Sequence, residues 1–254
     1  MRTTRVTAPL SVFLGATVMI ALAAAVFAAE HWTYSGGEGP EHWASIDSDF
    51  ALCSAGRQQS PIDLSGAAQR DVANPQTAYT ATDARIVNNG HTIQVELRAG
   101  SSLILDGVTY QLIQFHFHSP SEHTIGGQSF PVEVHLVHRS DSGALAVIGV
   151  LVSGGTGNDA LASLIAAMPT KAGKEARLSA PFDPTVLLPL DRRAYRYAGS
   201  LTTPPCSEGV SWVVMANPIQ ASGPQIAALA RVLQGNSRPP QPGNGREIVL
   251  DTTP

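Results

Sequence analysis

The sequence predicts a single, mainly β domain of the α+β class, in which helices are a minority. Its apolar runs are short, rich in β-branched residues, and separated by Gly, Pro, Asn and Asp, which is typical of many strands joined by turns. Only two segments carry apolar residues at helical spacing. A length of 254 residues, with 43% hydrophobic and 14% charged residues and neither a repeat nor a linker, suits one compact domain.

The expected strands follow from short apolar stretches between turn signals. They cover residues 92–97, 102–105, 110–118, 132–138, 145–152 and 212–216, with a last strand at 248–250 behind a Pro-rich loop. One helix is expected to begin at Asp159 and to stop at Pro169. A second begins near Ser222 and Pro224 and ends at Gly235.

Residues 1–28 are predicted to be a secretory signal peptide, with the mature domain at 29–254. Arg2 and Arg5 precede an apolar stretch that closes in small residues, and cleavage after Ala28 or after Ala29 fits. An uncleaved membrane anchor is the alternative, because about 20 apolar residues can span a bilayer. The Ala-rich end favours cleavage, which leaves no stable membrane insertion and a periplasmic or secreted protein.

The two cysteines, Cys53 and Cys206, do not form a CxxC pair, so zinc–thiolate chemistry is unsupported. In an oxidising compartment we expect them to form one disulfide, which contributes at most about 5 kcal/mol. Two buried free thiols are the alternative.

The net charge of -4, with 16 Lys and Arg residues and no basic run, argues against nucleic acid as a partner.

Two of the predicted strands place histidines on defined faces. Because side chains alternate along a strand, His116 and His118 share one face with Gln114, opposite two phenylalanines. In the next strand His135 shares a face with Glu133. If the strands pair, the three histidines form a trio.

Three neutral imidazoles with a fourth position open to water are the ligand set of a catalytic zinc ion, Zn²⁺. Ligating histidines need a partner for the other ring nitrogen, and Gln114 and Glu133 stand on the faces that can supply it.

The remaining histidines carry less specific expectations. His138, on the face of Val134 and Leu136, is expected to be a buried, hydrogen-bonded imidazole. His123 and His42 are expected to be structural or surface residues, and His31 is expected at the pocket rim.

A cupin-like metal site is a rival interpretation, because Glu122 follows His118 at the cupin ligand spacing. The glycines of that pattern are missing, since Tyr110 and Ser129 stand in their places. A metallo-β-lactamase site would need Asp where Pro120 stands, and the zincin motif HExxH is absent.

Several segments closely resemble the α-class carbonic anhydrases, and they extend from about residue 31 to residue 246. They are Gly39-Pro40-Glu41-His42-Trp43, Gln59-Ser60-Pro61-Ile62, Asn88-Asn89-Gly90-His91, Gln114-Phe115-His116-Phe117-His118, Ser121-Glu122-His123-Thr124, Glu133-Val134-His135-Leu136-Val137-His138 and Gly199-Ser200-Leu201-Thr202-Thr203-Pro204-Pro205. The resemblance implies a large, mostly antiparallel, twisted central sheet with small peripheral helices. It also implies that residues 29–254 form one catalytic domain.

Carried over residue by residue, the resemblance implies a complete site. The zinc ligands fall on His116, His118 and His135. Thr202 donates its single proton to Glu122, so its oxygen must accept from zinc-bound hydroxide. His91 falls at the proton-shuttle position, where an imidazole with a pKa near 6.5 suits the task.

The resemblance also implies the cavity walls. An apolar wall for carbon dioxide and a polar path for protons fall on two sets of residues. They are Val137, Val147, Leu201, Thr203, Val210 and Trp212 for the substrate pocket, and Tyr34, Asn89 and Gln94 for the proton path.

The implied activity is the zinc-dependent, reversible hydration of carbon dioxide to bicarbonate and a proton. Two alternatives stay open: a catalytically silent, carbonic-anhydrase-related binding module on the same fold, and a cupin-like metal enzyme. The expected small-molecule partners are carbon dioxide and bicarbonate, and a homodimer is compatible with the resemblance.

Overall fold

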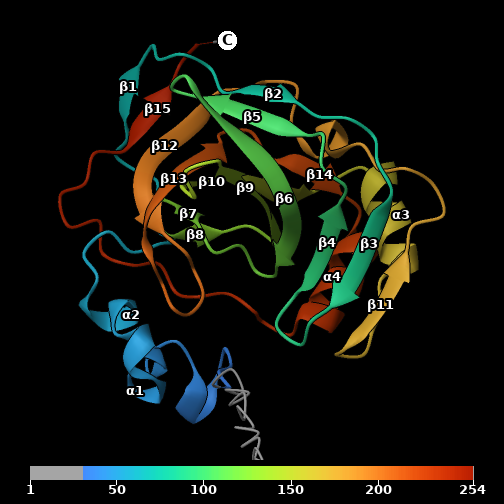
Figure 1. The fold of residues 1–254 in the computed structure, drawn as a ribbon, viewed down its shortest axis with the longest axis horizontal. Coiled ribbons are helices and arrows are strands. Elements are labelled where there is room, and N and C mark those ends of the chain that lie inside the picture. The colour runs from blue at the N-terminus through green and yellow to red at the C-terminus, as the bar shows by residue number, and fades with distance from the viewer. Residues whose placement is uncertain (1–30, 254) are drawn as a thin grey trace, which may run out of the picture.

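The structure, a computed structural model, describes residues 31–253 of the chain. The predicted signal segment, residues 1–28, and its cleavage site lie outside the described residues. One large twisted sheet of 13 strands organises the domain, and a separate pair, β7 and β8, forms a small hairpin beside it (Figure 1).

The strands of the large sheet run in the order β1-β15-β12-β13-β10-β9-β6-β4-β3-β11, while β14 pairs with β10 and β5 pairs with β2 and β6. Most pairs are antiparallel; β1 with β15, β10 with β13 and β10 with β14 are parallel. The predicted mainly β, mostly antiparallel architecture is therefore confirmed. The strand bounds are β1 Ala68–Arg70, β2 Gln76–Ala78, β3 Ala84–Asn88, β4 Ile93–Leu97, β5 Ser102–Leu105, β6 Val108–His118, β7 Thr124–Ile125, β8 Gln128–Ser129, β9 Val132–Ser140, β10 Leu145–Gly154, β11 Lys174–Arg177, β12 Ala194–Ser200, β13 Glu208–Met215, β14 Ile219–Ala221 and β15 Val249–Asp251.

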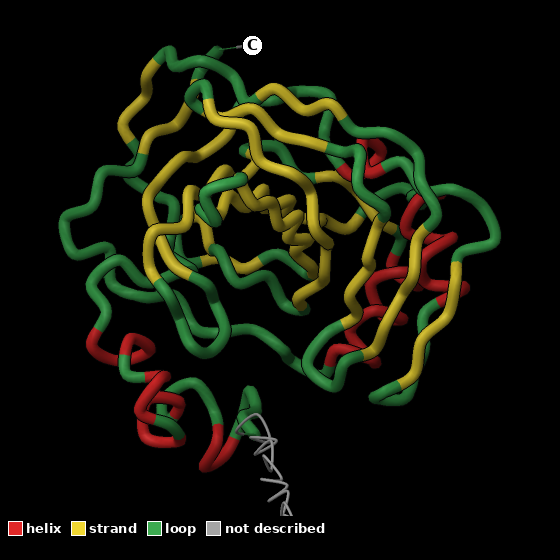
Figure 2. Tube along the Cα trace, in the orientation of Figure 1, coloured by secondary structure: helices red, strands yellow, loops and turns green. Residues whose placement is uncertain are grey.

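The helices are short and peripheral (Figure 2). They are α1 Trp43–Ile46, α2 Leu52–Ala55, α3 Asp159–Ala167 and α4 Gly223–Leu233, with three-residue or four-residue 3₁₀ turns at Gly36–Glu38, Ser48–Phe50 and Pro184–Leu187. Both predicted helices are confirmed. Asn158 caps the start of α3, and Ser222 and Gln225 form a capping box at the start of α4.

The sheet buries its two faces differently. One face carries the main core, against which the leucines of α3 and α4 pack. Phe115 and Phe117 of β6 belong to this core, as do Val134 and Leu136 of β9. The opposite face carries a smaller apolar cluster that includes Trp212. The next alternating positions of β6 and β9 therefore project from the opposite face of the sheet, where polar side chains gather.

Sequence patterns located the central strands better than the edges. The structure contains strands at each predicted position, but the 212–216 prediction covers only the second half of β13. Its first half contains Glu208, Gly209 and Ser211, which hide the apolar alternation. The short strands β1, β2 and β11 were missed because they are largely exposed and polar. The sequence analysis also missed β3, β12, β14 and the β7–β8 hairpin.

The predicted disulfide is confirmed, since Cys53 and Cys206 are bonded and 153 residues apart in sequence. The alternative of two free thiols is wrong. The bonded pair packs with the buried Trp43 in a third small cluster, which fixes the N-terminal helices against the body of the domain. Within residues 31–253, no helix is long and apolar enough to span a membrane.

Candidate metal centre

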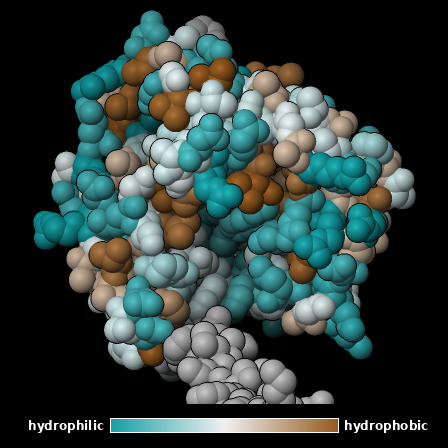
Figure 3. All heavy atoms as spheres, viewed as in Figure 1, coloured by the Kyte–Doolittle hydropathy of each residue, from teal (hydrophilic) through white to brown (hydrophobic). Residues whose placement is uncertain are grey.

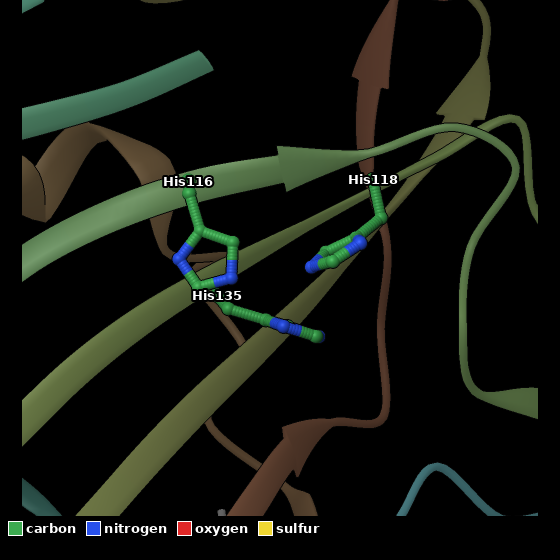
Figure 4. A group of neighbouring side chains, drawn as sticks. All are labelled: His116, His118 and His135. Atoms are coloured by element: carbon green, nitrogen blue, oxygen red, sulfur yellow. The ribbon is translucent and has the colours of Figure 1, made fainter. Parts of the chain in front are cut away.

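Three histidine rings converge on the polar face of the sheet. His116 and His118 come from β6 and His135 from β9, and His116 lies directly opposite His135 in the ladder. The candidate ligand nitrogens all lie within 4.8 Å of one another. Figure 4 shows the rings grouped around one space. The two-residue repeat of β6 and the pairing of β6 with β9 therefore produce the trio.

Each ring has one nitrogen already engaged by an acceptor. His116 Nδ1 lies 2.9 Å from Gln114 Oε1, and His135 Nε2 lies 2.9 Å from Glu133 Oε1. His118 Nδ1 lies 2.7 Å from the backbone oxygen of Asn236. Because oxygens of these kinds accept hydrogen bonds, the engaged nitrogens carry the protons.

The remaining nitrogens carry the lone pairs: Nε2 of His116, Nε2 of His118 and Nδ1 of His135. Among the described residues, His118 Nε2 is buried and has no hydrogen-bond partner. A buried lone pair without a donor is costly unless a cation or another donor meets it. This donor set fits a metal ion.

Burial also keeps the rings neutral. It lowers the pKa of His116 well below its usual value, lowers that of His118 to about 4, and lowers that of His135. Neutral imidazole is the form that binds metals. The trio is thus ready to bind a cation at neutral pH.

Glu133 lies at the centre of a fully buried hydrogen-bond network. Its Oε1 accepts from His135 and, at 2.7 Å, from His123 Nδ1, while its Oε2 accepts the backbone N–H groups of Glu122 and His123. Burial would raise the pKa of Glu133, but the His123 and His135 rings and these hydrogen bonds hold it well below the usual range. His123 Nε2 in turn lies 2.7 Å from the Tyr197 hydroxyl. His123 is therefore structural, within the expectation for it.

Glu122 is buried beside the trio. Its Oε1 accepts the backbone N–H of Arg238 at 2.9 Å, and the buried Thr202 side chain hydrogen-bonds the same carboxylate. Its Oε2 lies 3.6 Å from His118 Nε2 and 3.8 Å from His135 Nδ1. Burial raises the pKa of Glu122 to about 7, although His135, Arg238 and Thr202 act to lower it. Neither group of close metal-binding atoms among residues 31–253 includes Glu122.

An apolar wall borders the trio on one side. The ring of Trp212 lies 4.8 Å from that of His135, centroid to centroid. Five residues predicted for the substrate pocket belong to one cluster, namely Val137, Val147, Leu201, Val210 and Trp212. Thr203 is half-buried beside Thr202, and its backbone oxygen accepts the N–H of Cys206. Figure 3 shows a hollow between β6 and β12 on this face of the molecule.

The polar residues predicted for the proton path occupy different environments. The half-buried His91 ring stacks on Trp32, with centroids 3.8 Å apart. Burial lowers the pKa of His91, and the charge of His31 lowers it further. Tyr34 packs edge-on against Trp32. These rings and His31 line a cavity of about 200 Å³. None of the three candidate ligands lines it, so the position of His31 at the rim of the metal site stays a prediction.

Asn89 and Gln94 are held by protein groups. Asn89 Oδ1 accepts the N–H groups of His91 and Thr92, so it shapes the turn that carries His91. Gln94 lies opposite His116 in the ladder, and its amide donates to Glu96.

The other histidines agree with their expectations. His138 is fully buried and lies 2.8 Å from the Tyr79 hydroxyl. His42 is exposed at the N-terminus of α1.

Comparison with known proteins decides the family. The sequence model for eukaryotic-type carbonic anhydrases matches residues 38–252. The chain belongs to this family.

Relatives named carbonic anhydrase extend along the same region. One from Pectobacterium carotovorum is 42% identical over 86% of this chain and 90% of its own length, and one from Nostoc is 44% identical over 86% and 85%. The α-carbonic anhydrase of Thermovibrio ammonificans, solved with the inhibitor sulfanilamide, superposes with a TM-score of 0.85 at 41% identity. It covers 87% of this chain and 100% of its own. The cupin-like interpretation is therefore wrong, because the chain belongs to the carbonic anhydrase family, superposes on an α-carbonic anhydrase, and does not have Glu122 in either group of close metal-binding atoms among its described residues.

The same comparisons include dioscorins, such as one from Dioscorea polystachya at 36% identity. The three-histidine geometry of this chain agrees with the relatives named carbonic anhydrase.

Sequence reasoning missed two residues that complete the site. Asn236 supplies the oxygen that orients His118, and Arg238 supplies the N–H that binds Glu122. Both contributions come from the backbone, which leaves no signature in side-chain type. Their place before a Pro-rich stretch gave only a loop prediction.

Proposed function

We propose that the chain catalyses the reversible hydration of carbon dioxide to bicarbonate and a proton, with zinc held by His116, His118 and His135. The observation that carries this proposal is the convergence of three neutral imidazoles, each fixed from behind by an acceptor. Zinc with three such ligands keeps a fourth position open and, as a Lewis acid, lowers the pKa of bound water to about 7.

Gln114, Glu133 and the Asn236 carbonyl hold the three rings in position. A hydrogen bond to the second ring nitrogen fixes the tautomer and the ring plane, and it raises the basicity of the ligand atom. Their acceptor oxygens lie 2.7 to 2.9 Å from the rings. The site is therefore preorganised before any cation binds.

Thr202 and Glu122 orient the nucleophile. The carboxylate of Glu122 is a hydrogen-bond acceptor, so Thr202 donates its only hydroxyl proton to it. The Thr202 oxygen is then left as an acceptor towards the cavity. It selects a nucleophile whose O–H points at Thr202 and whose lone pair points at the substrate carbon.

The apolar cluster around Trp212 binds the uncharged substrate. Carbon dioxide offers no charge, so a weak, non-directional apolar surface beside His135 suits it. We assign the substrate pocket to Val137, Val147, Leu201, Thr203, Val210 and Trp212. Bicarbonate, which is charged, is held poorly by such a wall and leaves.

His91 takes the proton to solvent. Its lowered pKa keeps the ring neutral, and so able to accept a proton, at neutral pH. We assign Tyr34 and Gln94 to the proton path, and Asn89 to positioning His91 through its turn. His91 at the surface can then pass the proton to buffer.

The export of the chain is part of the proposal. A bonded Cys53 and Cys206 support an oxidising compartment, periplasmic or extracellular, after removal of residues 1–28. Mass spectrometry of the exported protein tests the cleavage site. The homodimer stays a prediction, which light scattering checks.

The complete ligand set speaks against a catalytically silent binding module. Stopped-flow hydration of carbon dioxide by the purified exported protein, before chelation, after chelation and after zinc is restored, decides between the two. We expect activity to disappear with the metal and to return with it. A zinc-loaded protein without hydration activity would mean that the chain is a binding module.

A further inference from the structure

A three-residue segment after α4 connects the metal ligands to the orienting carboxylate. In the 236–238 segment, the Asn236 carbonyl accepts from His118 Nδ1 at 2.7 Å, and the Arg238 N–H donates to Glu122 Oε1 at 2.9 Å. Its backbone thus reaches a metal-binding ring and the hydrogen-bond partner of Thr202 within two residues. Small shifts of this segment would move both groups.

The side chain of Arg238 anchors that segment on its other side. It is 2% exposed, and its guanidinium donates to Gln59 Oε1, to the Ser60 carbonyl and to the Cys53 carbonyl at 2.7 to 2.9 Å. Its Cζ atom also lies 5.7 Å from the centroid of the Trp43 ring. Burial lowers the pKa of Arg238 to about 10, so the group stays charged at neutral pH. Neutral oxygens and the Trp43 ring contact the guanidinium, and the charge of Glu122 raises its pKa.

The groups that Arg238 binds are themselves attached to the Thr202 loop. Gln59 Nε2 donates to the Cys206 carbonyl at 3.0 Å, and Cys53 is bonded to Cys206. The Cys206 N–H donates to the Thr203 carbonyl at 2.8 Å. Arg238 therefore connects Glu122, through its backbone, to the loop of Thr202, through its side chain.

We propose that Arg238 is a positioning residue. Its guanidinium fixes the 236–238 segment, so that the backbone N–H of Arg238 holds the Glu122 carboxylate within hydrogen-bond distance of Thr202. This inference rests on the proposed function, and it adds a residue that acts through other groups, chiefly through Glu122. Hydrogen bonds weaken steeply with angle, and misplacement of a catalytic group by about 1 Å can reduce rates by up to 10²-fold. A loosened segment would reduce turnover without removing any zinc ligand.

Arg246 offers a matched control eight residues along the chain. Its guanidinium also donates to backbone carbonyls, those of Gly243, Ala198, Gln59 and Pro242. It also lies 5.7 Å from an aromatic centroid, that of Tyr197. None of its hydrogen bonds reaches Glu122 or Thr202. Arg238→Met and Arg246→Met therefore remove similar anchors, of which only the Arg238 anchor belongs to a residue whose own backbone N–H binds Glu122.

The test measures kcat, KM, zinc content and melting temperature of both zinc-loaded variants beside the wild type. We expect Arg238→Met to lower kcat by about tenfold or more, with KM and zinc content unchanged. Arg246→Met should keep kcat within about twofold even where its melting temperature falls. Arg238→Lys keeps the charge but loses the planar set of N–H donors, so its kcat should be intermediate. Equal losses of kcat in the two Met variants would overturn the proposal.

A double-mutant cycle with Glu122→Gln adds a readout that a purely structural role does not move. If Arg238 acts through Glu122, Arg238→Met should reduce kcat little further in the Glu122→Gln background. Additive losses would contradict this coupling.

Hydrogen exchange gives a readout independent of activity. The amide of residue 238 should exchange about tenfold faster in Arg238→Lys, which is the milder variant and the one expected to fold, than in the wild type. An amide that stays equally protected would overturn the inference even in an active enzyme. An inactive wild type with a protected amide would instead count against the proposed function alone.

Discussion

The two faces of β6 are stabilised in different ways. Phe115 and Phe117 are fully buried in the main core, where their rings meet edge to face within a cluster of apolar residues. His116 and His118 come from the alternate positions of the same strand. In each ring Nδ1 donates to an acceptor, and the lone pair of Nε2 is left for a cation. One face of the strand therefore contributes to stability through apolar packing, while the arrangement of the other face depends on individual hydrogen bonds.

The largest expected effect comes from a substitution on the polar face of β6. His118→Ala removes one of three zinc ligands, and we expect hydration activity to fall to the uncatalysed background. Zinc content after dialysis and stopped-flow rates measure this. A variant that keeps both full zinc content and full activity would mean that the cation binds elsewhere.

Phe115→Ala breaks the apolar face instead. Removing a fully buried ring leaves a cavity, and we expect a loss of about 3–5 kcal/mol in the free energy of unfolding. Denaturant titration measures the loss. While the variant is folded it should bind zinc and hydrate carbon dioxide, and a loss of zinc in the folded state would contradict the separation of the faces.

Glu122→Gln tests, within the polar face, the role of a carboxylate that is not a metal ligand. The amide can present its N–H₂ group to Thr202, which then no longer needs to donate, so the nucleophile loses its orientation. We expect kcat to fall by roughly 10²–10³-fold, by analogy with the loss of one preorganised electrostatic contact. Zinc content should stay at the wild-type level, because Glu122 is not one of the three grouped ligands; metal analysis checks this.

Gln114→Ala tests the support behind one ligand. His116 loses the acceptor that fixes its tautomer, so zinc affinity should fall by about 10–100-fold. Competition with a chelator of known affinity measures the change. Unchanged affinity would show that strand geometry alone orients the ring.

The smallest effect concerns His91, at the cavity rim. In weak buffer we expect His91→Ala to lower kcat roughly tenfold, with imidazole partly restoring it. Because burial and His31 lower the pKa of His91, its neutral, proton-accepting form should persist as the pH falls to 6.5. A pH profile of kcat in dilute buffer checks this; a wild-type rate in the variant would exclude His91 as the shuttle.

The same contrast explains what could be predicted from the sequence. Alternation along β6 and β9 located both faces, the three rings and the supports Gln114 and Glu133, because side-chain type and spacing encode them. The third support could not be located in this way, since it is a backbone carbonyl 118 residues from its histidine. Helices α1 and α2, with four residues each, are too short to show a period.

The bond between Cys53 and Cys206 has a consequence for the order in which the protein matures. A chain that is exported from its N-terminus delivers Cys53 first, and 153 further residues must cross before its partner is available. The loop of Thr202, next to Cys206, is therefore covalently fastened only when most of the chain has arrived. A product truncated before Cys206 would carry all three histidines, yet it would lack the disulfide, the strand β13 that pairs with β10, and the Asn236 carbonyl that supports His118.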